Sequence, residues 1–553
     1  MRKGPSVRKG PFLIRTWQFA ILFGVLAAAA AFLFAGLPIP CVWDSGSYYQ
    51  NARFLRTGEY VWEDWYPSFT GPSQFLFPLG GYSLWVYACQ GLEDGTGVPW
   101  FFWLKWIQFA CYLHAGYLVF AIASRLGRPL AGVAGTVLYF AYFQFLNTAT
   151  LMMSETAGVW LALLVPWLLL KGLQEDRPWI VGLSFLFAGY SMLVRTVLGA
   201  MVPAVLLAAV LAKRSRWRWR TWAVLGVLLV ACPAAQSLWN RAVFGNYRVR
   251  AGSAFNFYSH VIELDQSIPA DCPHMEALRH TVYRRGEAKW FNGWWDLAAY
   301  LSEQGYSKEK VEEIAADIAW AGFCQNKARY CWSTLTSSCR IAVAHSPLEQ
   351  VYRDQEQTFA GIRGFGASDR QHAMLSADLM RQEPYYQGNA LAAASLEAHR
   401  QVADAYDIVF SSLYLQYPIV LGYLVWLAVT IYRVCRPGSQ TGAARTGTVP
   451  AAVQAGTVTV LGKGDSPRQT APGTVPFSGP FSGRRQHVPT LVIAVMAILG
   501  IVGSCMFEAA GIRYRLTSQP LLLLGFVLGV AELGRAASRR RAGERGAPPG
   551  RAG

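Results

Sequence analysis

The chain has 553 residues, of which 53% are hydrophobic and only 15% are charged. Soluble domains carry about 25% charged residues, so the composition excludes an ordinary soluble protein and indicates a membrane protein. The formal net charge of +17 does not indicate a nucleic-acid binder. The basic residues gather beside apolar runs, and no zinc-finger, helix-turn-helix or RNA-binding signature accompanies them.

Apolar runs recur along the chain at the length that a bilayer requires, which is about 20 residues of helix. The first run, 17–36, is too long for a signal peptide and lacks a small-residue cleavage site, so we interpret it as an uncleaved helix. Further spans are predicted at 100–124, 129–148, 156–171, 178–194, 197–212, 221–238, 408–432, 488–506 and 519–534. The sequence therefore predicts an all-α polytopic membrane protein with about ten transmembrane helices and a large outer-side domain.

The charges of the loops predict the orientation, because cytoplasmic loops carry an excess of Lys and Arg. The first outer loop, 38–99, holds six acids against two arginines. The predicted inside segments are all basic, and they contain Arg2, Lys3, Arg8, Lys9 and Arg15; Arg125 and Arg128; Lys171 and Arg177; Lys213, Arg214, Arg216, Arg218 and Arg220; Arg433 and Arg436; Arg484 and Arg485; and Arg535, Arg539, Arg540 and Arg541. We expect a multi-pass protein of the plasma (inner) membrane with both termini in the cytoplasm.

The segments between the spans differ in composition. An N-terminal membrane domain, 1–238, includes the first outer loop. Residues 239–407 are of mixed charge and rich in Trp and Tyr, with helical patterning near 307–345, which suits a folded outer domain. One span, 408–432, leads to residues 437–487, whose Gly, Ser, Thr and Pro content and GTVP and PFSGPFSG repeats cannot bury a core and predict a disordered cytoplasmic linker. Two helices within 488–534 and a basic cytoplasmic tail, 535–553, complete the chain.

The cysteines lie mainly on the predicted outer side, where an oxidising compartment permits disulfides. Cys272, Cys324, Cys331 and Cys339 fall in the outer domain, and Cys41 and Cys89 fall in the first outer loop. We expect at least one disulfide within 272–339, with three pairings open, and free buried thiols as the alternative. No CxxC motif or Cys/His cluster indicates a metal site.

An acidic residue, Asp44, lies just beyond the first helix and is followed by Tyr48 and Tyr49. This position is at the boundary between water and lipid, where a membrane-held substrate can meet a soluble one. A carboxylate there can accept the proton of an acceptor hydroxyl. The alternative is an ordinary loop acid that caps a helix over 45–56.

Basic residues stand on the outer side against the usual charge bias. Arg513 and Arg515 precede the last helix, and a guanidinium offers a planar fork that fits a phosphate. Snorkelling to lipid headgroups is the alternative. Arg195 and Glu155 lie at the outer ends of other spans, and ionisable residues at such depth are functional candidates. Three cations and two acids thus converge on one face, as transfer from a lipid phosphate requires.

Six short elements occur in the order known from one group of enzymes. They are Asp44 with Tyr48 and the Ala52/Leu55/Gly58 spacing; Pro78-Leu79-Gly80-Gly81-Tyr82-Ser83-Leu84; Ser154-Glu155; Leu193-Val194-Arg195; Asn240-Arg241 with Phe244-Gly245; and Arg513-Tyr514-Arg515-Leu516. The chain resembles the glycosyltransferase C superfamily, in particular its bacterial dolichyl-phosphate-mannose-protein mannosyltransferase-like and lipid A aminoarabinose transferase-like branch. Many relatives have an acid and an arginine where this chain has Ser45 and Ser47, so its phosphate site would rest on other arginines.

The resemblance implies a glycosyltransferase that takes a sugar from a polyprenyl-phosphate donor and passes it, with inversion, to a hydroxyl of a lipid, glycan or protein. Asp44 would accept the hydroxyl's proton, and arginines would stabilise the departing phosphate. The candidate residues are Asp44 and Glu155 for catalysis, Arg195, Arg513 and Arg515 for the donor phosphate, and Tyr48, Tyr82 and Tyr514 for substrate. A divalent metal could assist, but no ligand set in the sequence identifies one.

Three other functions fit the composition. A transporter or lipid flippase would place its charge clusters and helix breaks near the midplane of the membrane, whereas the unusual charges here fall at the outer surface. A catalytically silent scaffold of the same fold and a different membrane sugar-polymer enzyme, such as an O-antigen ligase-like protein, are the remaining alternatives.

Overall fold

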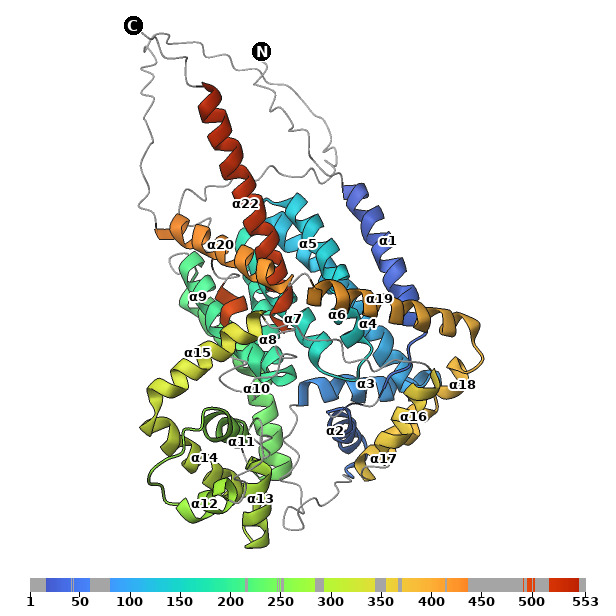
Figure 1. The fold of residues 1–553 in the computed structure, drawn as a ribbon, viewed down its shortest axis with the longest axis vertical. Coiled ribbons are helices and arrows are strands. Elements are labelled where there is room, and N and C mark those ends of the chain that lie inside the picture. Colours follow the sequence, from blue (N-terminus) through green and yellow to red (C-terminus); the bar gives the residue numbers. More distant parts are fainter. Residues whose placement is uncertain are drawn as a thin grey trace, which may run out of the picture.

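The computed structural model describes residues 16–40, 42, 44–59, 80–213, 217–245, 247, 249, 253–283, 293–343, 355–366, 370–412, 415–435, 491, 495–499, 501–502 and 517–546. Within these ranges the chain is helical and contains no strand (Figure 1). The predicted linker 437–487 lies outside the described residues, as does more than half of the span predicted at 488–506.

The helices of the N-terminal part are α1 (Thr16–Ala35), α2 (Ser45–Thr57), α3 (Gly80–Thr96), α4 (Trp100–Arg125), α5 (Pro129–Ala141), α6 (Gln144–Ala149), α7 (Glu155–Gln174), α8 (Pro178–Val194), α9 (Met201–Lys213) and α10 (Trp219–Phe244), with a 3₁₀ turn at Thr196–Ala200. Proline opens α5 and α8 at the first helical position, where its missing N–H is not needed. Gly58 ends α2 in the left-handed conformation, with φ of 71°.

The helices that follow are α11 (Ser253–Tyr258), a π-helical turn at Ser259–Leu264, α12 (Met275–Tyr283), α13 (Gly293–Glu303), α14 (Lys308–Gln325), α15 (Lys327–Val343), α16 (Gln355–Gly366), α17 (Arg370–Met380), α18 (Glu383–Tyr386), α19 (Ala390–Ser412), α20 (Gln416–Cys435) and α22 (Gln519–Gly546). The helical patterning noted near 307–345 corresponds to α14 and α15. The last helix extends twelve residues past the predicted end of its span at 534.

The chain is a multi-pass membrane protein. By length and composition, five helices of the described part can cross a bilayer: Trp17–Ala35, Trp100–Arg125, Glu155–Gln174, Trp219–Val243 and Gln519–Ser538. Four shorter apolar helices lie at Pro129–Ala141, Pro178–Val194, Thr196–Val210 and Gln416–Tyr432. These nine helices overlap nine of the predicted spans. The all-helical membrane architecture is confirmed, and the total of ten spans stays a prediction.

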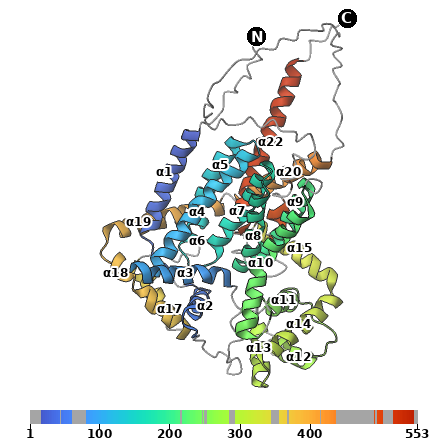
Figure 2. The same cartoon turned by 180° about the vertical axis from the view of Figure 1, so that it is seen from behind.

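The membrane helices pack around α4, α7 and α8. α10 lies along α8, α20 lies along α22, and α5 contacts both α4 and α22. The beginning of α1 and the end of α22 lie toward one end of the molecule, whereas α2, α12, α13 and α17 lie toward the other (Figures 1 and 2). This arrangement fits termini on a common side, and the assignment of that side to the cytoplasm stays a prediction.

The predicted outer segment, 239–407, contains two groups of helices that bury different cores. Residues of α11–α15, with Tyr258, Leu297 and Ile318 at the centre, form a hydrophobic cluster of their own. Residues of α16–α19, including Phe359, Leu375 and Tyr386, belong to the main core that also contains the membrane helices. The second group therefore lies against the membrane body, where it contacts α1 and α2.

The N-terminal helix is tied to the body by one buried lysine. Lys105 of α4 donates to the carbonyl oxygens of Ala35 and Leu37 at 2.9 and 2.7 Å, and to the Tyr386 hydroxyl at 3.0 Å. A cation at the end of α1 is also favoured by the helix dipole. Ser395 of α19 adds two bonds, from Gly36 N–H at 2.8 Å and to the Phe32 carbonyl at 2.6 Å.

The disulfide expected within 272–339 is not found. Cys272 is a buried thiol, and Cys324, Cys331 and Cys339 are exposed thiols. Cys331 and Cys339 share α15 and stand eight residues apart, which is about 12 Å along a helix, whereas a disulfide needs Cα atoms within about 7 Å. The expectation was wrong because sequence shows only that cysteines share a compartment, and not whether their helices bring them together.

Candidate active site

The loop between α1 and α2 carries Asp44 and is held at both ends. Gln382 binds the backbone of Ile39 twice, accepting from its N–H at 2.9 Å and donating to its carbonyl at 2.8 Å. Ser45, the first residue of α2, donates to the Met152 carbonyl at 3.0 Å. These contacts fix the start of α2 against the loop that precedes α7, and thereby fix Asp44.

Asp44 is the N-cap residue of α2 by position, as the alternative interpretation of the sequence held, but its side chain makes no capping hydrogen bond. A side chain that capped the helix would accept from a backbone N–H two or three residues along. The structure thus gives no support for the view that Asp44 serves only to cap α2.

Tyr48 lies at the centre of the charged groups. Its hydroxyl donates to the Ser154 hydroxyl at 2.9 Å, and its ring meets Tyr82 edge-on with centroids 4.7 Å apart. Burial, together with the nearby charges of Asp44 and Glu155, raises the pKa of Tyr48 above its usual range, while Arg195 acts in the opposite direction. The phenol therefore keeps its proton at physiological pH, and the carboxylates and the guanidinium all lie close enough to act on it.

Tyr82 closes the buried side of this cluster. Its hydroxyl donates to Gln108 Oε1 at 2.6 Å, and Gln108 Nε2 donates to the carbonyls of Ala149 and Leu151 at 3.1 and 3.0 Å. Gln108 was not among the site residues predicted from the sequence. The signal that could have found it is an amide inside the apolar span 100–124, because polar residues within membrane helices are functional candidates.

Glu155 and Arg195 form a buried ion pair, with Arg195 Nη1 2.7 Å from Glu155 Oε1. Their side chains are only 3% and 5% exposed, respectively. Glu155 is the first residue of α7 and Arg195 follows the last residue of α8, so each charge also suits the dipole of its own helix. The two residues are 40 positions apart. Both were predicted from the sequence as site residues, but their pairing was not predicted.

Gly158 allows the Arg195 side chain to reach this position. A Cβ atom at Gly158 would lie 2.9 Å from Arg195 Cδ and 2.8 Å from Thr517 Cγ2, so any larger residue would displace one of them. Thr517 is buried and lies two positions after Arg515 in the sequence. The C-terminal segment that leads into α22 therefore begins beside Arg195.

The structure brings together five of the predicted site residues: Asp44, Tyr48, Tyr82, Glu155 and Arg195. Arg513, Tyr514 and Arg515 lie outside the described residues. Among the residues that are described, no group of three or more His, Cys, Asp or Glu side chains could hold a metal ion.

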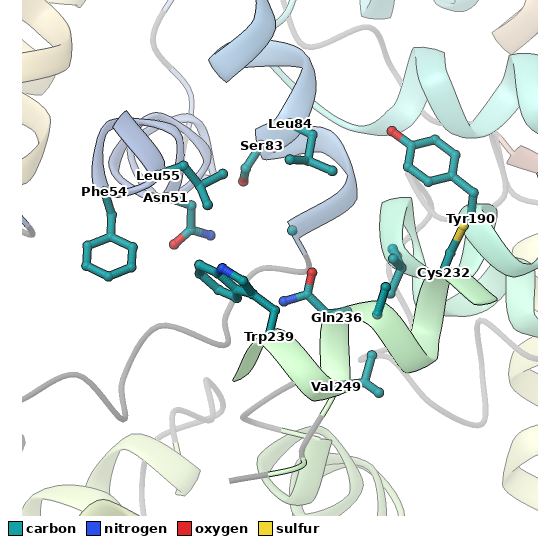
Figure 3. A pocket seen from close by; sticks show the side chains of 13 residues that line it. Asn51, Phe54, Leu55, Ser83, Leu84, Tyr190, Cys232, Gln236, Trp239 and Val249 are labelled. Carbon is teal, nitrogen blue, oxygen red and sulfur yellow. The ribbon is translucent and has the colours of Figure 1, made fainter. Parts of the chain in front are cut away.

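An apolar cavity of about 310 Å³ adjoins the cluster, between α2, α3, α8 and α10 (Figure 3). Its lining includes Phe54 and Leu55 from α2, Leu193 from α8 and Trp239 from α10. α10 is an apolar helix whose outward side chains, such as Leu238, are exposed and suit contact with lipid. The cavity therefore lies between α10, whose outward face suits lipid, and Leu193 of α8, which is two residues before Arg195.

Comparisons with known proteins bear on the membrane helices. Residues 100–239 match the family model described as dolichyl-phosphate-mannose-protein mannosyltransferase. No curated protein matches the chain. One similar solved structure is that of ArnT from Cupriavidus metallidurans bound to undecaprenyl phosphate, with 14% identity, 77% of this chain and 82% of that chain covered, and a TM-score of 0.30.

The family match covers about a quarter of the chain and includes Gln108, Glu155 and Arg195, but not Asp44 or the 513–515 segment. An independent comparison thus confirms the resemblance inferred from short elements: over residues 100–239 the chain is similar to the dolichyl-phosphate-mannose-protein mannosyltransferase family.

Proposed function

We propose that the chain is a membrane glycosyltransferase that moves a sugar from a polyprenyl-phosphate donor to an acceptor hydroxyl at the outer membrane face, with inversion at the anomeric carbon. One observation carries the proposal: the Tyr48 hydroxyl donates to the Ser154 hydroxyl at 2.9 Å, which brings the start of α2, with Asp44, beside the buried Glu155–Arg195 ion pair. A carboxylate can take the acceptor's proton, and a guanidinium can stabilise the departing phosphate. Transfer from a lipid phosphate needs both groups beside one substrate.

Asp44 acts as the general base in this mechanism. It accepts the proton of the acceptor hydroxyl while the hydroxyl oxygen bonds to the anomeric carbon and the bond to the phosphate oxygen breaks. Tyr48, which keeps its proton, orients substrate oxygens beside Asp44, and Tyr82 supports the Tyr48 ring.

Arg195 binds the donor phosphate, and Glu155 positions Arg195. The ion pair holds the guanidinium in one orientation, and a carboxylate already paired at 2.7 Å is a poor proton acceptor. We therefore assign Glu155 a positioning role in place of direct catalysis. Arg513, Tyr514 and Arg515 complete the phosphate and substrate site, which is supported by the contact of Thr517 with the same region.

The assignment of a polyprenyl donor is supported by the apolar cavity beside α10, because a hydrocarbon chain needs apolar walls and α10 is a candidate membrane span. The family description, which names a dolichyl-phosphate sugar as donor, agrees with this chemistry. The outer-face location rests on the loop charges.

The test uses the purified full-length protein in liposomes with radiolabelled polyprenyl-phosphate sugars and a membrane extract as source of acceptors. We expect at least one donor to be consumed with label appearing in an acceptor. Asp44→Asn keeps the size of the side chain but cannot accept the proton, so transfer should fall by about 10²–10⁴-fold.

Asp271→Asn makes the same substitution at an exposed aspartate of the outer region and should match the wild type. A folded Asp44→Asn protein that keeps more than about a tenth of wild-type transfer would contradict the base assignment. Wild-type protein that consumes none of the donors would contradict the function itself.

A further inference from the structure

A second, polar cavity lies on the side of α2 that faces α17. It has a volume of about 270 Å³ and is lined by Tyr49, Arg53, Arg56, Gln90, Glu93, Asp94, Trp100, Asp378 and Arg381. Tyr49 directly follows Tyr48, so the helical twist turns the two phenols toward different neighbours. We refer to this cavity as the α2–α17 cleft. Neither the sequence elements nor the proposed mechanism assigns it a role.

The charges that line the α2–α17 cleft balance each other. Three guanidiniums face three carboxylates, and two close ion pairs form among them: Arg56 with Asp94, and Arg381 with Glu93 at 2.5 Å. Arg381 also lies 3.7 Å from Asp378. Because the walls carry no excess charge, they give no net attraction to a phosphate or to an ammonium group. A neutral ligand is therefore favoured over an ionic one.

The floor of the cleft is built around Asp378 of α17. Its Oδ2 atom accepts from the Tyr49 hydroxyl at 2.6 Å and from Trp100 Nε1 at 3.4 Å. Tyr49 and Trp100 are 7% and 1% exposed, so this part of the cleft is rigidly packed. Burial and the Asp378 carboxylate together raise the pKa of Tyr49 above its usual range, which keeps its proton in place.

Gln90 gives the independent indication of a ligand. It is only 6% exposed and lines the cleft, yet its Oε1 atom has no hydrogen-bond partner among the described residues. A buried amide oxygen left unpaired costs about 1–3 kcal/mol. A bound group that donates a hydrogen bond to Gln90 Oε1 would remove that cost.

The ligand must both donate and accept. Gln90 Oε1 and the carboxylates accept hydrogen bonds, whereas the guanidiniums of Arg53, Arg56 and Arg381 only donate. A hydroxyl group does both. A ring with several adjacent hydroxyls can therefore pair with the donors and the acceptors that line the cleft without carrying a charge. The volume is just below the roughly 300–1,000 Å³ of sites for drug-sized ligands, which suits one sugar ring.

We propose that the α2–α17 cleft binds a ring of the acceptor, and that the acceptor is therefore a neutral saccharide. This inference rests on the proposed function. Tyr49 stands five residues after Asp44, about 7.5 Å along a helix axis, so a short oligosaccharide held in the cleft can extend toward the general base.

The test measures binding without catalysis. Purified full-length protein in nanodiscs is titrated by calorimetry with three neutral trisaccharides: mannotriose, cellotriose and triacetylchitotriose. We expect at least one to bind at millimolar concentration or tighter. Gln90→Leu removes the unpaired acceptor and should weaken binding roughly fivefold, the equivalent of one hydrogen bond. Gln304→Leu, on the exposed surface of the outer region, should leave binding unchanged.

Wild-type protein that binds none of the three overturns the proposal, and this result needs no variant to fold. Tighter binding of an acidic or an amino trisaccharide, or full binding by folded Gln90→Leu, also overturns it. Asp44 lies outside the cleft, so Asp44→Asn should bind as the wild type does while it loses transfer. Wild-type protein that binds a trisaccharide but transfers no sugar from any donor contradicts the proposed function and leaves saccharide binding in the cleft standing.

Discussion

Replacing Glu155 by Gln removes the carboxylate that lies 2.7 Å from the Arg195 guanidinium. Arg195 is 5% exposed, so the cation stays buried when its partner loses its charge. Removing one member of a buried ion pair typically costs 3–5 kcal/mol. We therefore expect the free energy of unfolding of Glu155→Gln to fall by about 3–5 kcal/mol, measured by chemical or thermal unfolding in detergent.

A matched double variant separates charge from packing. Glu155→Leu combined with Arg195→Met removes both charges and keeps apolar volume, and such replacements of buried pairs are often neutral or stabilising. The double variant should therefore be more stable than Glu155→Gln. It should also lose donor binding, because no guanidinium remains to meet the phosphate.

Polyprenyl phosphate distinguishes a ligand-binding arginine from a purely structural one. A phosphate beside Arg195 would replace the missing counter-charge in Glu155→Gln, and a ligand at one hundred times its Kd stabilises the folded state by about 2.7 kcal/mol. Added polyprenyl phosphate should raise the melting temperature of Glu155→Gln and have no effect on the double variant. An equal shift in both variants, or a loss of stability below about 1 kcal/mol in Glu155→Gln, would refute the reasoning.

Three other predictions concern the donor site, the attachment of α1 and the orientation in the membrane. The Arg513/Arg515 double alanine variant should raise the apparent KM for donor, and Arg515→Lys should raise it too because the planar fork is lost. Unchanged KM values would leave both residues as lipid-facing surface arginines. Lys105→Met leaves buried oxygens at the end of α1 without their donor and should cost about 2–4 kcal/mol in thermal unfolding, whereas Lys171→Met should cost little. Reporter fusions after Lys213, within 250–400 and within 440–480 should read inside, outside and inside, and an outside reading for the last would contradict the orientation.

The membrane helices could be predicted because each apolar run carries its own signal. The runs at 100–124, 156–171 and 178–194 correspond to α4, α7 and α8 within three residues at each end. Transfer of about 20 apolar residues into lipid is a local property of the chain and needs no knowledge of its partners.

The site could be predicted only as separate residues. Asp44, Glu155 and Arg195 could be predicted because a charged side chain at the end of a membrane span is energetically costly, and such residues usually belong to functional sites. The Glu155–Arg195 pair and the contact between Gly158 and Thr517 arise from packing across the sequence, and no local pattern encodes them. The docking of α16–α19 on the membrane body was not predicted for the same reason. An amphipathic pattern shows that a helix has an apolar face, but not which surface this face packs against.

The thirteen residues of α2 serve three neighbours at once. Ser45 and Tyr48 face the candidate active site, Tyr49, Arg53 and Arg56 line the α2–α17 cleft, and Asn51, Phe54 and Leu55 line the apolar cavity. One residue inserted after Gln50 would turn everything that follows by about 100° and exchange these faces. Length variation among related chains should therefore be rare inside α2, and more frequent beyond Gly58, where the helix has ended.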